Sequence, residues 1–234
     1  MYVFYAPEAE LDFFTLPQDE SVHCLRILRF KKGDTIVVTN GKGLLLEAQI
    51  ESDLGGEVQL KKARVLQQNE KPKYNLHIAI SPLKNASRFE WFVEKAVELR
   101  VTQIIPLICK RTERAKVRID RLQRIAMEAM KQSVSTFLTE VSQPEELNHF
   151  LSADRNGFSK YIAACSQSEV NYLDGEDSKS VVVMIGPEGD FTDEELKMAV
   201  EKGYKILSMG TSRLRTETAG VFAAASMYYK HIRE

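Results

Sequence analysis

Short apolar runs alternate with turn residues through the first 70 positions of the chain. The stretch "YVFYA" predicts a strand, and "KKGDTIVVTNGKGLLLEAQI" predicts two strands joined by Asn-Gly, a dipeptide typical of tight hairpins. A further strand is expected in "GGEVQLKKARVLQQ". The segment "DESVHCLRILRF" predicts a short helix, with Asp19 or Ser21 as its cap. Several short strands at such close spacing indicate a small β-barrel.

The pattern changes after "NEKPK", a polar, proline-containing stretch at residues 69–73 that is typical of a linker. Apolar runs of strand length then alternate with amphipathic segments of helix length. The strands are expected in "NLHIAIS", "QIIPLIC", "YIAAC", "VVVMIG" and "KILSMG". The helices are expected in "SRFEWFVEKAVELR", "RIDRLQRIAMEAMKQS", "TDEELKMAVEKG" and "ETAGVFAAASMYYKHIR". This alternation predicts an α/β domain with a mostly parallel sheet and helices on its faces. We therefore divide the chain into a first domain at 1–70, a linker at 71–74 and a second domain at 75–234.

The stretch "VVVMIGPEGDFTDEEL" ends a predicted strand in a sharp glycine turn. In an open α/β sheet, ligands bind beyond the carboxyl ends of the strands, where Gly186 and Gly189 fall. A glycine there lets the backbone approach a ligand closely. Thr192 and Glu195 have the spacing of a capping box, which opens a helix that Gly203 closes. A tight, well-capped turn without any ligand would explain this loop equally well.

A second turn of the same design follows in "SMGTSRLRTETAG", where Gly210 precedes a polar loop that enters a helix at Thr216. If the two strands are neighbours, their loops form one concave site. The charged residues of that site would be Glu188, Arg213, Arg215 and Glu217. The final helix carries the small residues Ala219, Gly220, Ala223, Ala224 and Ala225. A helix with so little bulk is either buried deeply or pressed against a partner subunit.

Composition narrows the class of protein. The chain has 234 residues, 44% of them hydrophobic, and no apolar run reaches the roughly 18 residues that span a membrane. The N-terminus lacks the pattern of a signal peptide. Cys24, Cys109 and Cys165 are far apart in apolar surroundings, which indicates buried free thiols. The four histidines have no metal-ligand spacing. We expect a soluble cytoplasmic protein without a metal and without membrane association.

Net charge is −1, but basic residues gather in two segments. The N-terminal basic segment, residues 26–32, reads "RILRFKK" and has four basic residues and no acidic one. The second basic segment, residues 110–124, has seven basic residues against two acidic ones. Each alone could be a solvated helix face. Two in a chain of balanced charge favour a polyanionic partner.

Common nucleotide and hydrolase motifs are missing from the sequence. It has no Gly-x-Gly-x-x-Gly after a strand, no Gly-x4-Gly-Lys-Ser/Thr and no Gly-x-Ser-x-Gly. A Rossmann dinucleotide site, a Rossmann-type methyltransferase, a P-loop and an α/β-hydrolase therefore lack their signatures.

The pair "IGPEGDFTDEE" and "MGTSRLRTETA" resembles the signature motifs of the SPOUT methyltransferases. The whole chain is most similar to the ribosomal RNA small subunit methyltransferase E family, the uracil-N3 enzymes of 16S rRNA. "HCLRILRFKKGD" is similar to the PUA-like RNA-binding segment of that family. "EKAVELRVTQIIPL" is similar to the helix and strand that follow its linker.

The resemblance implies a PUA-like β-barrel followed by a SPOUT domain with a deep trefoil knot, S-adenosylmethionine bound in the knot without a metal, and a homodimer whose interface uses the last helix. The residues that would line the cofactor, largely through backbone groups, are Ile185, Gly186, Pro187, Glu188, Gly189, Met209, Gly210, Leu214 and Thr216. Arg26, Arg29 and Lys31 would contact 16S rRNA of the small subunit, and Arg111 and Arg114 are further RNA-binding candidates from the second basic segment.

Arg215 and Glu217 would lie nearest the transferred methyl group and the uridine. Uracil N3 is a poor nucleophile until its imide proton leaves, so a cationic Arg215 near O2 or O4 would stabilise the developing charge. Glu217, or water, could accept the proton. A phosphate contact for Arg215 and a helix N-terminal charge interaction for Glu217 remain open alternatives.

The chain departs from the family pattern at two places. Relatives read roughly Glu-Leu-Gly-Val where this chain has Arg100 at the third position, which predicts an altered helix end. Relatives also tend to read Glu-Gln-Ser-x-Arg where residues 131–135 read Lys-Gln-Ser-Val-Ser. Two other functions stay open: a SPOUT enzyme with another target, such as a ribose 2′-hydroxyl or tRNA, and a non-catalytic RNA-binding assembly factor.

Overall fold

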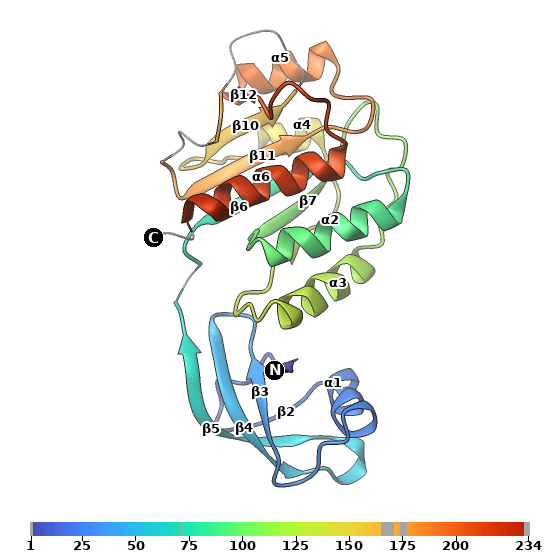
Figure 1. The fold of residues 1–234 in the computed structure, drawn as a ribbon. Helices are drawn as coiled ribbons and strands as arrows, with labels where there is room; N and C mark the ends of the chain where they lie inside the picture. Colours follow the sequence, from blue (N-terminus) through green and yellow to red (C-terminus); the bar gives the residue numbers. More distant parts are fainter. Residues whose placement is uncertain (1, 71, 165–170, 174–176, 232–234) are drawn as a thin grey trace. The chain divides into compact units, whose positions relative to one another are not determined.

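The computed structural model describes residues 2–70, 72–164, 171–173 and 177–231 (Figure 1). Its contacts divide the chain into two compact units. Unit 1 comprises Met1–Pro72 and Met127–Leu138, and unit 2 comprises Lys73–Ala126 and Thr139–Glu234. The first boundary falls within the expected linker, of which residue 71 lies outside the described residues. The return of residues 127–138 to unit 1 has no counterpart in the sequence-based division.

Unit 1 is built on a five-stranded sheet. Its strands, in spatial order, are β1 (Val3–Tyr5), β3 (Thr35–Thr39), β4 (Leu44–Ser52), β5 (Gln59–Gln68) and β2 (Phe13–Thr15). β1 runs parallel to β3, and the other neighbours are antiparallel. The expected Asn-Gly hairpin joins β3 to β4, and Asn40 Oδ1 accepts hydrogen bonds from the backbone N–H groups of Lys42 and Leu44. The other four strands fall in the predicted segments, whereas β2 was not predicted.

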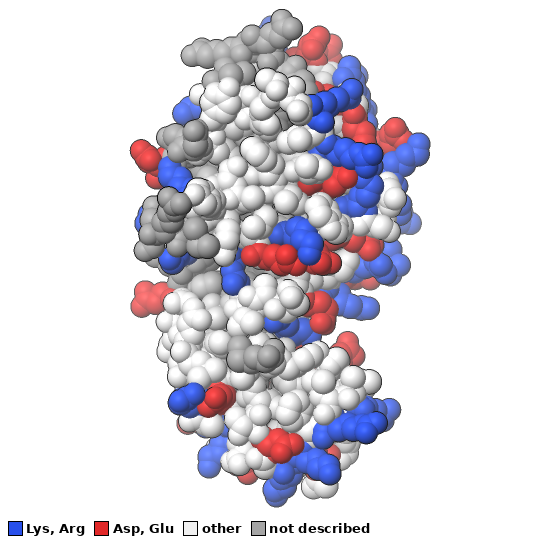
Figure 2. Space-filling model, in the orientation of Figure 1, with Lys and Arg blue, Asp and Glu red and all other residues white. Residues whose placement is uncertain are grey.

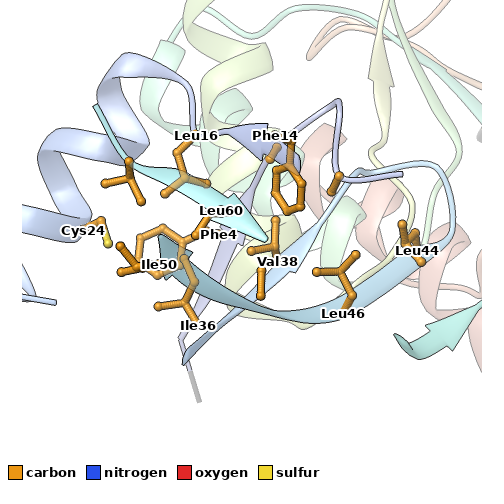
Figure 3. Packing of buried hydrophobic residues seen from close by; sticks show 14 residues of the cluster. Phe4, Phe14, Leu16, Cys24, Ile36, Val38, Leu44, Leu46, Ile50 and Leu60 are labelled. Carbon is orange, nitrogen blue, oxygen red and sulfur yellow. The ribbon is translucent and has the colours of Figure 1, made fainter. Parts of the chain in front are cut away.

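One hydrophobic cluster forms the core of unit 1. Alternate residues of the strands point inward, so the side chains of Phe4, Val38, Leu46 and Ile50 pack against one another (Figure 3). Cys24 joins them from the helical segment and is fully buried. This core supports the turn that carries the N-terminal basic segment.

The helical segment of unit 1 differs from the prediction. α1 (Gln18–Val22) begins after Pro17 and has no side-chain cap, so the assignment of Asp19 or Ser21 as the cap is wrong. Ser21 is instead buried and donates its hydroxyl to the carbonyl of Leu16. A π-helical turn, His23–Ile27, continues the chain, and π-turns of this kind often occur at functional sites.

The sequence departure at residues 131–135 forms a buried ion pair within unit 1. Lys131 Nζ lies 2.5 Å from Glu20 Oε1 and 2.8 Å from Glu128 Oε1. The other oxygen of Glu20 accepts a hydrogen bond from the backbone N–H of Tyr5 at 3.2 Å. Because Glu20 supplies the matching charge, the buried Lys131 is accommodated at this position.

Unit 2 is built on a parallel sheet, as predicted. In spatial order its strands are β12 (Lys205–Leu207), β10 (Ser159–Ala163), β11 (Ser180–Ile185), β6 (Asn75–Ile80), β7 (Gln103–Ile108) and β8 (Glu140–Val141), with β9 (Glu145–Glu146) also on β7. Every pairing is parallel. Because neighbouring strands share one direction, their carboxyl ends meet at one edge.

Helices cover both faces of this sheet. They are α2 (Ala86–Glu98), α4 (Leu147–Ser152), α5 (Asp193–Glu201) and α6 (Thr216–His231), while α3 (Ile119–Gln132) begins in unit 2 and ends in unit 1. α6 packs on β6, β11 and α2 (Figure 1). Side chains of α4 and α5 pack with the opposite set of strand residues, including Ala79, Val182 and Met184.

The end of α2 explains how an arginine replaces glycine at position 100. Arg100 adopts the left-handed conformation, with φ of 62°. Its N–H donates to the carbonyl of Val97, and the N–H of Val101 donates to the carbonyl of Ala96. These two bonds form a Schellman motif, the ending that glycine adopts without strain. Arg100 therefore adopts an ending that glycine favours, at a conformational cost of about 1–2 kcal/mol.

The small residues of α6 face the interior of unit 2. Ala223 and Ala224 are fully buried, and a Cβ added to Gly220 would lie 2.4 Å from the ring of Phe92 on α2. Glycine therefore permits the close approach of the two helices. Gly220, Ala223 and Ala224 therefore serve packing within the subunit, whereas Ala225 is only half-buried.

Two cysteines lie within the described residues, and both are buried free thiols, as predicted. Burial raises the pKa of Cys24 to about 11 and also raises the pKa of Cys109. Neither thiol is therefore disposed to act as a nucleophile. Cys165 lies outside the described residues. In the part of the chain that the structure describes, no helix is long and apolar enough to cross a membrane.

Candidate cofactor and RNA site

A cavity of about 650 Å³ opens at the carboxyl edge of the sheet in unit 2. The register of the strands brings Ala163 of β10 level with Ile185 of β11 and with Leu207 of β12. The loops that follow these strands form most of the wall. The lining residues are Arg88, Ala163, Ala164, Ile185, Gly186, Pro187, Glu188, Asp190, Leu207, Ser208, Met209, Gly210, Thr211, Ser212, Arg213, Leu214, Arg215, Thr216 and Ala219.

The two glycine loops meet in this cavity, but their strands are not neighbours. β10 lies between β11 and β12, so the two loops reach one site although their strands do not pair. The hydroxyl of Thr216 joins the loops, because it donates to the carbonyl of Gly186 at 3.1 Å. Arg213 Nη2 also reaches the carbonyl of Glu188, at 3.5 Å. One site forms from both loops, as the sequence predicted.

The loop after β11 is a tight turn. The N–H of Asp190 donates to the carbonyl of Pro187, and Asp190 adopts a left-handed φ of 62°. A Cβ at Gly186 would lie 3.1 Å from the ring of Phe191, so glycine keeps the backbone close to that ring. The predicted capping box is confirmed: Thr192 and Glu195 each accept the backbone N–H of the other residue.

Arg111 holds this loop from the neighbouring strand connection. Its Nη1 lies 2.7 Å from the carbonyl oxygen of Gly189 and 3.3 Å from that of Phe191. A Cβ at Gly189 would meet the Arg111 side chain at 3.3 Å rather than the cavity. Gly189 was predicted to line the cofactor site, yet it lies outside the lining residues. Its described contact is with the arginine that fixes the turn.

Glu188 is the acidic side chain with the most distinctive surroundings in the cavity wall. Its Oε1 accepts the backbone N–H of Lys84 at 3.2 Å. Its Oε2 is buried and has no hydrogen-bond partner within the described part of the chain. A buried carboxylate oxygen without a donor is costly, by roughly 1–3 kcal/mol. Glu188 is therefore suited to receive a donor group from a ligand.

Arg88 reaches the cavity from the first turn of α2, and sequence reasoning missed it. Its Nε and Nη2 lie 2.7 Å and 2.5 Å from Oε1 of Glu217. Glu217 is almost fully buried between the helices and lies outside the lining residues. Arg215 lines the cavity, so the structure brings Arg215 and Arg88 to one site and places Glu217 behind Arg88. No spacing signal links two residues 129 positions apart.

The residues predicted to bind RNA fall into two environments. Arg26, Arg29 and Lys31 are exposed in unit 1, and their side chains have no hydrogen-bond or ion-pair partner among the described residues. Arg111 and Arg114 belong to unit 2, where both donate to backbone carbonyls, Arg114 to that of Lys84 at 3.4 Å. Over the face drawn in Figure 2, basic and acidic side chains are interspersed.

No group of three or more histidine, cysteine, aspartate or glutamate side chains is arranged for a metal ion among residues 2–70, 72–164, 171–173 and 177–231. The cavity wall combines glycine loops and apolar side chains with arginines, hydroxyl side chains and the carboxylates of Glu188 and Asp190. This composition suits an organic ligand with both apolar and charged parts.

Comparison with known proteins defines the class. The family model described as the RNA methyltransferase domain matches residues 69–228, and the RNA methyltransferase PUA domain matches residues 16–62. The site described above therefore belongs to an RNA methyltransferase with an N-terminal PUA domain.

The relatives define the family. The chain is 31% identical over 232 residues to ribosomal RNA small subunit methyltransferase E of Synechocystis sp., covering 95% of this chain and 75% of that protein. It is 30% identical over 226 residues to the Rickettsia conorii protein of the same name, covering 94% and 91%. The chain belongs to the ribosomal RNA small subunit methyltransferase E family, whose members are S-adenosylmethionine-dependent rRNA methyltransferases.

Solved structures agree with this assignment. A probable rRNA-methyltransferase from Porphyromonas gingivalis superposes with a TM-score of 0.90 at 31% identity, covering 100% of this chain and 99% of that one. Ribosomal RNA small subunit methyltransferase E from Neisseria gonorrhoeae, bound to S-adenosyl methionine, gives 0.87 at 28% identity, with 98% of each chain covered. The predicted fold class, with a PUA-like domain before a mostly parallel α/β domain, is confirmed. The trefoil knot stays a prediction.

Proposed function

We propose that this chain methylates N3 of a uridine in the 16S rRNA of the small ribosomal subunit, with S-adenosylmethionine as the methyl donor. The observation that supports this most directly is the cavity at the carboxyl edge, built from two glycine loops and open to Arg215. Family membership supplies the substrate class.

The residues of the cavity fit the cofactor. Its volume of about 650 Å³ falls in the ordinary range for small-molecule sites. Ile185, Leu207 and Leu214 offer apolar walls, and the glycine loops expose backbone groups. The free oxygen of Glu188 suits a cationic or N–H donor on the ligand. When bound, S-adenosylmethionine supplies an activated methyl group on a sulfonium, so the protein has only to orient and activate the acceptor.

Arg215 is the residue we assign to the acceptor base. It lines the cavity immediately before Thr216, whose hydroxyl fixes the start of α6. A guanidinium at O2 or O4 of uracil stabilises the charge that develops when the imide proton leaves. Holding N3 in line with the methyl group supplies a further part of the rate enhancement. An imide proton is far more acidic than a ribose hydroxyl, so a wall of arginines favours base methylation over ribose methylation.

Methyl transfer to small subunits isolated without the modification tests this function. Labelled S-adenosylmethionine, the purified chain and those subunits should yield N3-methyluridine, identified by mass spectrometry of the nucleosides. A 2′-O-methylated nucleoside would replace the proposed acceptor by a ribose hydroxyl. Cofactor binding without transfer to free rRNA or to subunits would favour the non-catalytic assembly factor.

RNA recognition in the proposed function begins with the N-terminal basic segment. Arg26, Arg29 and Lys31 are exposed around a π-helical turn, and cations of this kind contact phosphates. The substrate is ribosomal RNA, which places the proposed activity in the cytoplasm. Arg111 and Arg114 are weaker candidates for RNA contact, because both hold backbone carbonyls of unit 2.

We further propose a homodimer through the outer face of α6. Phe222 and Tyr229 on that helix are 46% and 61% exposed, and their spacing of seven residues places them on one face. Ala225 lies on that face as well, whereas Gly220, Ala223 and Ala224 are buried within the subunit, so the outer face supports dimerisation. Light scattering after size-exclusion chromatography should give a dimer for the wild type and a monomer for Phe222→Glu. A wild-type monomer at micromolar concentration would contradict the dimer.

A further inference from the structure

Arg88 and Glu217 form an ion pair between the first turns of two helices. Asn85 caps α2 by accepting the N–H of Ser87 at 2.9 Å, so the position of Arg88 on the helix is fixed. Both Arg88 donors reach a single oxygen of Glu217, at 2.7 Å and 2.5 Å. The other oxygen, Oε2, is buried without a partner among the described residues.

Backbone packing determines where this pair lies. Gly220 is one turn along α6 from Glu217, and Phe92 is one turn along α2 from Arg88. The absence of a side chain at Gly220 lets the Phe92 ring lie directly against α6. The two helices are therefore held at short range beside the pair, and the ion pair cannot widen without disturbing the core of unit 2.

The two partners differ in what they face. The Glu217 side chain is 8% exposed and the Arg88 side chain is 31% exposed. Arg88 lines the cavity, whereas Glu217 does not. The guanidinium has five N–H donors, and two of them point to Glu217. The other three have no acceptor in the part of the chain that the structure describes, so they are available to a ligand.

The chemistry of the acceptor base suggests that ligand. Loss of the N3 proton leaves a negative charge shared between N3 and the two carbonyl oxygens that flank it, O2 and O4. Two oxygens gain charge, and three guanidinium groups line the cavity. That of Arg213 reaches the carbonyl of Glu188, which leaves those of Arg215 and Arg88 for the base. Donors aimed at the positions where charge develops lower the barrier most when they are already fixed in place.

We propose that Arg88 donates hydrogen bonds to one carbonyl oxygen of the target uracil as the imide anion forms, and that Glu217 is the positioning residue that fixes Arg88. This inference rests on the proposed function. Glu217 then acts through Arg88 and does not accept the imide proton. The proton passes to water, the N3 electron pair forms the bond to the methyl carbon, and the carbon–sulfur bond breaks with its electron pair on sulfur.

Fixing by Glu217 has a physical advantage. A free arginine loses rotamer freedom when it meets a ligand, whereas a guanidinium already held by a carboxylate loses little. The pair also keeps a partly buried cation from standing alone, which would be costly. The negative charge of Glu217 remains behind the guanidinium, away from the base, and the free donors of Arg88 face the cavity.

The test is Arg88→Gln, assayed under single-turnover conditions with saturating RNA and cofactor. We expect a loss of rate on the order of 10²-fold, because a donor to the developing anion is removed. The ascending limb of the pH–rate profile should also move to higher pH by about one unit or more, because the imide anion is less stabilised. Lys95→Gln removes a charge from the exposed side of the same helix and should change neither quantity.

Cofactor affinity separates uracil contact from cofactor contact. Calorimetry with S-adenosylmethionine in the absence of RNA should show less than about a threefold change for Arg88→Gln, since its partner is the base. A large loss of cofactor affinity with an unmoved pH profile would overturn the proposal and assign Arg88 to an anionic group of the cofactor. If Arg88→Gln fails to fold, Arg88→Lys keeps the charge but loses the planar fork, and it should show a smaller pH shift and a smaller rate loss in the same directions.

Glu217→Gln tests the positioning role. It should lower the single-turnover rate about tenfold and add little to Arg88→Gln in the double variant, because both changes act through one guanidinium. Glu90→Gln breaks the neighbouring pair with Arg121 and serves as its control. If Glu217→Gln abolishes the ascending pH limb while Arg88→Gln leaves it in place, Glu217 is the base and the proposal is wrong. If the wild type makes a product other than N3-methyluridine, the proposed function is wrong. That result can be told apart from a failure of the Arg88 proposal, in which the wild type still makes N3-methyluridine.

Discussion

The two basic segments are similar in sequence and differ in structure. In the N-terminal basic segment, Arg26 lies in a π-helical turn and Arg29 follows it, and both are exposed. No described residue pairs with their side chains. In the second basic segment, Arg111 and Arg114 donate to loop carbonyls and Arg121 pairs with Glu90. A count of charges cannot separate these cases. A cation whose donors already bond to the protein's own carbonyls or carboxylates is less available to RNA than a cation without such acceptors.

The largest effect should come from Arg111. Arg111→Ala removes two charge-assisted bonds to the loop after β11, which together contribute roughly 1.5–2 kcal/mol because the side chain is exposed and one bond is long. Cofactor affinity, measured by calorimetry, should fall about 10- to 30-fold. Arg26→Ala should leave it unchanged. Equal cofactor affinities for the two variants would remove the distinction between the segments.

RNA affinity, unlike cofactor affinity, should depend on the N-terminal basic segment and not on the second basic segment. Three phosphate contacts from Arg26, Arg29 and Lys31 give a log–log salt slope of about −2 for single-stranded RNA. The double variant Arg26→Gln and Arg29→Gln should reduce it to about −0.7 and weaken binding about fivefold near physiological salt. Fluorescence anisotropy across a salt series measures both quantities.

Arg111→Gln and Arg114→Gln together provide the matched control for that experiment. Loss of these two arginines should leave the salt slope of RNA binding within error of the wild type. Their guanidinium groups already donate to carbonyls of unit 2. A slope that falls by about 1.4 would show that these arginines release their carbonyls and contact phosphates.

Gly189→Ala should disturb the contact between Arg111 and the loop after β11 without removing it, so its effect on cofactor affinity should be smaller. The new Cβ would lie 3.3 Å from Arg111 Cδ, and the end of a flexible side chain can shift by a few tenths of an ångström. We expect a two- to threefold loss of cofactor affinity, roughly 0.5 kcal/mol. The variant should have no further effect in an Arg111→Ala background. A full loss of binding in both backgrounds would indicate that position 189 meets the cofactor directly.

The smallest effect should come from Lys110. Its Nζ pairs with Glu194 at 3.0 Å, and both side chains are well exposed. Exposed pairs contribute between about 0 and 1 kcal/mol. Lys110→Ala should change cofactor affinity, RNA affinity and thermal midpoint by amounts close to experimental error. A loss of cofactor affinity comparable to that of Arg111→Ala would mean that the total charge of the second basic segment matters, rather than the partner of each cation.

Local patterns in the sequence predicted local structure well. The hairpin at Asn40 and the capping box at Thr192 follow from side chains that bond their own backbone within a few residues, so their partners are visible in the sequence. The strand–helix alternation predicted the parallel sheet of unit 2 because the hydrophobic period of each segment can be read within that segment. Both glycine loops were found as parts of one cavity.

Features that depend on distant partners could not be predicted. The placement of β10 between β11 and β12 depends on the path of the chain, which strand patterns do not specify. The pair of Arg88 and Glu217 joins residues 129 positions apart, and the hold of Arg111 on Gly189 joins residues 78 apart. Charge and motif reasoning therefore named Glu217 and Arg111 as candidates without their partners, and so missed what each side chain contacts.

The contact between Gly220 and Phe92 has a consequence for how this protein can vary through evolution. Since a Cβ at position 220 would lie 2.4 Å from the Phe92 ring, the two positions cannot change independently. A homologue with alanine at position 220 should carry a side chain smaller than phenylalanine at position 92. The combination of alanine at 220 with phenylalanine at 92 should be rare. Substitutions here should therefore appear as correlated exchanges, even though both residues lie away from the reacting atoms.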